Sequence, residues 1–148
     1  MLFRSAILHE RLAKDTINFT TDTFKVLLVG TGYTYNETSH QFVSDVSSNE
    51  ISATNYVRKS LTLTITRQDS ATPKRTVVIL SQPTWTSLGG ATNDTIAGAI
   101  WFKDTGSDST SPLCQFTDLT PSNLTTNGSN FQLTYDQTNG NLQISKGS

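Results

Sequence analysis

The sequence predicts a mainly β protein: an antiparallel β-sandwich or barrel of about seven to eight strands with a short N-terminal helix. Two observations support this fold class. Short apolar or alternating segments recur along the chain and are separated by turns rich in Gly, Asn, Asp and Pro. Thr and Ser supply 42 of the 148 residues, 25 of them Thr. Because Thr is β-branched, it suits the solvent face of a strand better than a helix.

Length and charge limit the possible architectures and partners. A chain of 148 residues is of ordinary size for one core, so we expect a single domain with a helical arm at 1–14 and a β-sandwich at 23–145. The net charge of -1 removes the electrostatic attraction that dominates nucleic-acid binding. No apolar run approaches the 18 residues of a membrane-spanning helix. Neither nucleic acid nor a membrane is therefore expected as a partner.

The N-terminal segment, residues 1–14, has the one helical pattern in the chain. Apolar residues recur there at spacings of three and four, and two leucines widen the stripe: Leu2, Phe3, Ala6, Ile7 and Ala13, with Leu8 and Leu12. A helix this short needs a surface to pack on. It could pack on its own sheet or dock as an arm on a neighbouring subunit.

The first confident strand is Thr23–Val29, which is apolar on both faces except at Lys25 and is therefore predicted to be central. A polar loop follows, in which Tyr33 and Tyr35 are expected to anchor the chain by packing one face of each ring. A short helical turn at 41–45 would close this loop on the core.

From Tyr56 onward the period changes to two. Leucine and isoleucine at 61, 63 and 65 alternate with threonine at 62, 64 and 66, which predicts a half-buried strand. Residues 76–80 form a short apolar strand. Residues 83–88 are expected at an edge, because Pro83 cannot donate a ladder hydrogen bond.

Residues 91–113 contain the hairpin around which we expect the other strands to pack. The apolar run 96–102 is followed by a polar tip, 103–112, and then by a second apolar segment, 113–116. Small residues around Gly98 would let another layer approach closely. Cys114, the only cysteine, is interpreted as a small buried hydrophobe rather than a reactive thiol.

The polar tip of this hairpin superficially resembles a calcium loop at Asp104 and Asp108. Counting from Asp104, the twelfth position holds Gln115 where the calcium loop needs an acidic residue, so a solvated turn is favoured.

The last third of the chain predicts a C-terminal hairpin. Phe131, Leu133 and Tyr135 alternate inward, Asn139-Gly140 is a strong turn dipeptide, and alternation resumes on the return. Across the whole chain, ten apolar residues are predicted to form one common core: Phe24, Val26, Leu28, Leu61, Leu63, Ile65, Val78, Ile100, Phe131 and Leu133.

The sequence contains no recognisable catalytic signature. His9 and His40 have no companion motif, and the chain has no G-x-S-x-G, no H-E-x-x-H, no P-loop and no cysteine cluster. The protein is therefore expected not to be an enzyme, with no catalytic, cofactor-binding or metal-ligating residue.

Several motifs resemble those of a family of small virion structural proteins of tailed bacteriophages, of the capsid decoration (cement) type. The similarity spans residues 1–145, and the segment from Lys103 to Leu113 is its most specific part. The matching segments are Lys25–Val29, Tyr33–Tyr35 with His40–Phe42, Tyr56–Leu61, Trp85–Gly90 and Lys103–Leu113.

The resemblance implies a structural role in the virion without catalysis. The leading hypothesis is a decoration protein on the outer capsid surface, with the major capsid protein and other copies of itself, as a homotrimer, as its partners. Contacts between copies in the trimer are expected from the N-terminal helix or the loops 31–50 and 103–112, and attachment to the particle is expected from the arm at 1–14. The candidate interaction residues are Phe3, Ile7, Leu8, Tyr33, Tyr35, Lys103, Asp104 and Asp108.

Two alternatives remain open at the level of sequence. One is a tail or head–tail connector component of the virion. The other is a host-contacting, carbohydrate-binding β-sandwich, in which Trp85, Trp101 and Tyr35 would stack on sugars if they were exposed. Core packing is the favoured use of both tryptophans.

Overall fold

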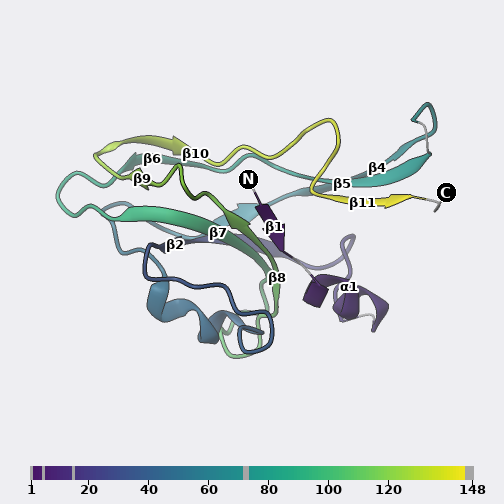
Figure 1. The fold of residues 1–148 in the computed structure, drawn as a ribbon, viewed down its shortest axis with the longest axis horizontal. Coiled ribbons are helices and arrows are strands. Elements are labelled where there is room, and N and C mark those ends of the chain that lie inside the picture. The colour runs from purple at the N-terminus through teal and green to yellow at the C-terminus, as the bar shows by residue number, and fades with distance from the viewer. Residues whose placement is uncertain (1, 5, 15, 72–73, 146–148) are drawn as a thin grey trace.

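The computed structural model describes residues 2–4, 6–14, 16–71 and 74–145, with the side chains of 2–7 and 9 outside the description. Within these residues the chain forms one α-helix, two short 3₁₀-helices and eleven strands, all paired antiparallel (Figure 1). The mainly β, antiparallel fold class is thus confirmed. The count exceeds the expected seven to eight because β1, β3 and β9 have only two or three residues each.

The elements have the following bounds in chain order: β1 Leu2–Arg4, α1 Ala6–Ala13, β2 Phe24–Gly30, η1 Val43–Asp45, η2 Ser47–Asn49, β3 Lys59–Leu61, β4 Leu63–Gln68, β5 Arg75–Leu80, β6 Thr84–Leu88, β7 Thr95–Lys103, β8 Leu113–Asp118, β9 Leu124–Thr125, β10 Ser129–Gln132 and β11 Leu142–Ser145.

The main sheet has the strand order β1-β8-β7-β2-β3, with β9 pairing an end of β7. The predicted hairpin of β7 and β8 with its long polar tip is present, and β7 pairs with β2, β8 and β9. Gly98 lies under the Phe116 ring, where an added Cβ would fall 2.3 Å from a ring carbon. A close approach at Gly98 is therefore present, but the prediction of another layer there is wrong, because the approaching ring belongs to β8 in the same sheet.

The second layer lies above the main sheet in Figure 1 and consists of β11-β5-β4 and of β10-β6. In Figure 1, β6 continues the line of β5. Strand β10 runs antiparallel beside β6, and β11 runs antiparallel beside β5. Two further backbone hydrogen bonds extend these pairings toward each other: Leu133 N donates to Pro83 O (3.1 Å) just after β10, and Asn141 N donates to Val78 O (2.8 Å) just before β11.

The predicted C-terminal hairpin is wrong, because β10 and β11 pair with β6 and β5 and not with each other. The intervening chain keeps its direction: Leu133 and Tyr135 face the core, and Asp136 accepts hydrogen bonds from Thr138 N and Asn139 N in a local turn. Gly140 of the Asn-Gly dipeptide adopts φ +70° and donates its N–H to Asp136 O (3.1 Å), so it belongs to this local turn and not to a hairpin between β10 and β11.

The predicted helix at 1–14 is correct only from Ala6. Residues 2–4 instead form β1, which pairs antiparallel with β8. Of the two interpretations of the helix, packing on its own protein is observed. Leu8 is fully buried in the main core, which excludes a free arm.

The described residues form two apolar clusters instead of the single predicted core, because β2 and β7 are buried on both faces. The larger cluster fills the space between the two layers and includes Trp85 and Trp101. The smaller one lies on the opposite face of the main sheet, and Ile100 belongs to it. Val43 and Val46, at the predicted helical turn, cover that face from the chain segment 31–50.

The predicted core is incorrect at Ile65, whose side chain is 45% exposed. Burial decreases along this strand from Leu61 through Leu63 to Ile65, although the alternation continues. The three-stranded part of the second layer extends past the main sheet in Figure 1, so its end has no opposite layer. Leu63 and Phe131 are half-buried at the core margin.

Replacing Leu133 by alanine is expected to lower the free energy of unfolding by about 2–5 kcal/mol, because it leaves a cavity in the larger cluster. The matched change Ile65→Ala should cost less than about 1 kcal/mol, since the side chain is already largely hydrated. Urea unfolding followed by circular dichroism measures both. Equal losses for the two variants would contradict this division of the core.

Candidate interaction surface

The segments predicted to make contacts meet at one end of the molecule. Two backbone hydrogen bonds join 31–50 to 103–112: Val43 N to Ser111 O (3.0 Å) and Ser44 N to Asp108 O (3.1 Å). A third, from Leu113 N to Gln41 O (2.9 Å), joins 31–50 to the first residue of β8. The helix α1 packs beside them, against β8. We call the outer face of α1 and of these two loops the α1–loop surface.

Arg11 joins the helix to the loop 31–50 and to the start of β8, directly after the hairpin tip. Its guanidinium donates hydrogen bonds to the backbone oxygens of Leu113 and Gln41, the second at 2.6 Å, and lies 5.5 Å from the centroid of the Phe42 ring. Burial lowers the pKa of Arg11 from its usual value. Phe42 is 37% exposed and is therefore the main apolar side chain on this surface among the described residues.

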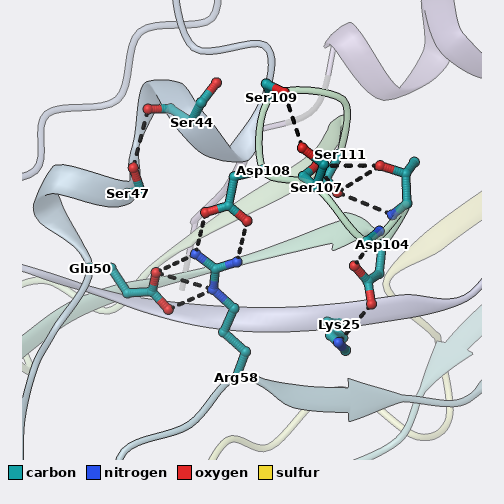
Figure 2. A network of polar contacts seen from close by, with 12 residues as sticks. Lys25, Ser44, Ser47, Glu50, Arg58, Asp104, Ser107, Asp108, Ser109 and Ser111 are labelled. Carbon is teal, nitrogen blue, oxygen red and sulfur yellow. Dashed lines mark hydrogen bonds and ion pairs between the residues drawn. The ribbon is translucent and has the colours of Figure 1, made fainter.

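Arg58 joins the two loops through two bidentate ion pairs, one with Glu50 and one with Asp108 (Figure 2). Its Nε and Nη2 lie 2.9 Å and 2.7 Å from the two carboxylate oxygens of Glu50, and its Nη1 and Nη2 lie 2.6 Å and 2.9 Å from those of Asp108. Hydrogen bonds to Asp108 and then Glu50 raise the pKa of Arg58. The same Arg58 contact lowers the pKa of Asp108.

The Arg58 network is attached to the central sheet. Tyr56 donates its hydroxyl hydrogen to Glu50 Oε1 (2.6 Å) and accepts a hydrogen bond from Leu28 N on β2 (3.0 Å). Arg58 also lies 5.7 Å from the centroid of the Phe102 ring on β7. Burial is the main cause that raises the pKa of Tyr56, so this hydroxyl stays protonated. The loops are thus fixed to β2 and β7, which are buried on both faces.

Asp104 and Lys103 hold the start of the hairpin tip. Asp104 pairs with Lys25 at 2.7 Å and accepts a hydrogen bond from Gly106 N, contacts that lower the pKa of Asp104. Lys103 pairs with Asp22 at 2.9 Å. The two carboxylates that resemble a calcium loop, those of Asp104 and Asp108, are therefore each paired with a cationic side chain of the protein. Among the described residues, no group of three His, Cys, Asp or Glu could hold a metal ion.

Tyr33 and Tyr35 anchor the first loop as predicted. The Tyr35 ring stacks on Phe116 (centroids 5.5 Å apart, 10° between planes), and the Tyr33 ring meets it edge-on at 5.2 Å. Both side chains remain half-buried. The tyrosines therefore serve first to cover the smaller apolar cluster.

The structure thus brings most of the predicted interaction residues together, with corrections. Tyr33, Tyr35, Lys103, Asp104 and Asp108 lie in the two loops. Leu8 was predicted as a contact residue but is fully buried, so its side chain has no surface to offer a partner. The side chains of Phe3 and Ile7 lie outside the described residues.

Residues that sequence reasoning missed are Arg11, Glu50, Tyr56 and Arg58, which organise the surface from within. The only signal for Arg58 was its place in the Tyr56–Leu61 motif, which gives no indication of its partners 8 and 50 positions away.

Both tryptophans are fully buried, with Trp85 Nε1 donating to Val57 O (2.7 Å) and Trp101 Nε1 donating to Gln115 Oε1 (2.9 Å). They are therefore not available to stack on a sugar. Cys114 is also fully buried, as predicted, and burial raises the pKa of its thiol.

Comparisons with protein-family models, with curated proteins and with solved structures found no match. No helix within the described residues has the length and apolar character needed to cross a membrane.

Replacing Arg58 by methionine should lower the free energy of unfolding by about 1–3 kcal/mol, since it leaves Glu50 and Asp108 without their charged donor. Arg67→Met is the matched control. Its ion pair with Asp69 is largely exposed, so the loss should stay below about 1 kcal/mol. Chemical denaturation of both variants at one ionic strength measures the difference, and indistinguishable stabilities would contradict a structural role for Arg58.

Acid should weaken this end of the molecule. The pKa values of Asp104 and Asp108 are lowered in the folded protein, so their stabilising contribution is present above the ordinary aspartate pKa of about 3.9 and is lost as pH falls through the folded values. Urea titrations at neutral pH and near pH 3 should show a smaller acid loss for Asp108→Asn than for the unmodified protein. The same acid loss in both would exclude Asp108 as a contributor.

Proposed function

We propose that this protein is a structural component of a tailed-phage virion, most specifically a decoration (cement) protein that attaches to the major capsid protein on the outer capsid surface. It acts there without catalysis and without a cofactor, and the homotrimer forms on the particle, where the capsid lattice templates its assembly. The contact to the capsid is made by the α1–loop surface.

The observation that carries the proposal is the convergence of α1 with the loops 31–50 and 103–112. Three segments that are distant in sequence are bound to one another by Arg11 and Arg58 and are fixed to the buried central sheet. Such preorganisation lowers the entropy that a binding surface loses on association. The most specific motif of the resemblance, Lys103–Leu113, lies within this surface.

Charge supports an outer location. With a net charge of -1, the protein lacks the excess of Lys and Arg that contact with packaged DNA would require. In addition, five of its described cationic side chains already pair with carboxylates of the same chain: Lys14, Lys25, Arg58, Arg67 and Lys103.

A protein that binds only the assembled shell stabilises that shell by mass action. The gain is RT ln(1 + [L]/Kd), or about 2.7 kcal/mol per site at a hundredfold excess over Kd. Because many sites act on one shell, modest affinity at each site is sufficient for a measurable effect.

The test uses particles that lack the protein, heated beside normal ones while DNA release is followed. Depleted particles should release DNA at a lower temperature with tails still attached, and added protein should restore the normal temperature. Ser109→Arg, on the exposed hairpin tip, should restore it poorly. Ser129→Arg, an exposed serine on β10, is the matched control and should restore it fully.

Equal release temperatures, with tails missing or detached, would contradict the decoration role and favour a tail or connector component. Truncation of residues 1–14 is not a clean test of attachment, because it would remove Leu8 from the core.

A further inference from the structure

Strand β4 leaves one of its edges without a neighbour. It is the outer strand of the sheet β11-β5-β4 and pairs with β5 over six consecutive residues without a bulge. The chain before it, β3, pairs with β2 only as far as Leu61 opposite Phe24. From Leu63 onward, no strand of the described protein lies on that side.

The ladder pattern shows which backbone groups are free. Ser81 N donates to Thr62 O (2.9 Å), and Thr62 N donates to Ser81 Oγ (3.0 Å), so the backbone of Thr62 points toward the β5 side. Backbone directions alternate along a strand, so Thr64 and Thr66 point the same way. The N–H and C=O groups of residues 63, 65 and 67 therefore point outward at the free edge.

The side chains of this edge are self-complementary. An antiparallel second copy of β4, centred on Ile65, would place Ile65 opposite Ile65 and Thr64 opposite Thr66. Such β-branched and Thr–Thr cross-strand pairs are favourable. Arg67 would face Leu63, so no like charges oppose one another, and each Arg67 is already paired with its own Asp69 at 2.7 Å.

The edge also lacks the features by which proteins usually block strand addition. Residues 63–68 contain no proline and no bulge, and the single cation is neutralised. Ile65 at its centre is 45% exposed although its neighbours on the same face, Leu61 and Val78, are buried.

We propose that β4 is a self-association site, at which two copies of this chain pair their β4 strands antiparallel about a twofold axis at Ile65. The two three-stranded sheets then form one continuous six-stranded sheet, and Ile65 is covered. The contact is independent of the proposed virion function, because β4 contributes no residue to the α1–loop surface. On a capsid it would connect neighbouring copies whose α1–loop surfaces are bound.

The first test exploits the direction of single N–H groups. Ile65→Pro removes an N–H that points outward, so it should leave the β4–β5 ladder intact and abolish pairing between copies. Thr66→Pro removes an N–H that faces β5 and should destabilise the fold itself. Sedimentation velocity from micromolar to near-millimolar protein should show a dimer for the unmodified chain and a monomer with an unchanged circular dichroism spectrum for Ile65→Pro.

A second variant keeps the proposal testable if Ile65→Pro does not fold. Ile65→Lys places two like charges opposite each other on the axis and should weaken dimerisation at least about tenfold. A monomeric unmodified protein at every concentration, or a dimer unaffected by Ile65→Lys, would overturn the proposal.

Oxidative cross-linking tests the register. Residue 65 lies on the twofold axis, so the Cα atoms of the two copies of this residue face each other at a distance that a disulfide can span. The variant Ile65→Cys should therefore give a covalent dimer. Ile144→Cys is the matched control on the opposite edge strand, with a side chain 61% exposed, and should cross-link far less. The native Cys114 is buried and does not compete. Equal cross-linking of both variants would overturn the assigned register.

Discussion

The rest of the structure depends on one constraint: β2 and β7 carry apolar side chains on both faces, so the central sheet must be covered twice. The second layer of strands covers one face. On the other face the described residues form no second sheet, and the cover is the irregular segment 31–50, which packs through Val43, Val46 and the two loop tyrosines. An irregular cover has few ladder hydrogen bonds of its own, so it needs other attachments.

Arg58 supplies the strongest of those attachments. A guanidinium presents its donors in a planar fork that matches two carboxylates at once, which a lysine at the same place would not do. Glu50 ends the covering segment and Asp108 lies in the hairpin tip, so one side chain fixes both loops. Stability of the smaller apolar cluster and the shape of the α1–loop surface are thus coupled through the same residue.

The sequence was sufficient to predict the features that depend on local pattern. The two-sided burial of β2 and the β7–β8 hairpin with its long tip follow from the pattern of apolar and polar residues alone. It could not predict where the opposite layer ends, which is why Ile65 was placed in the core. The C-terminal hairpin failed for a similar reason: alternation identifies β10 and β11 but does not identify their partners. Arg58 was missed because its carboxylates come from two other segments.

The proposed coating of the capsid is tested most directly by the copy number of the protein per virion. Quantitative mass spectrometry of purified particles gives the ratio of this chain to the major capsid protein. A decoration protein distributed over the lattice should have a copy number comparable with that of the capsid protein. A copy number as low as that of a single connector ring or a tail assembly would contradict it.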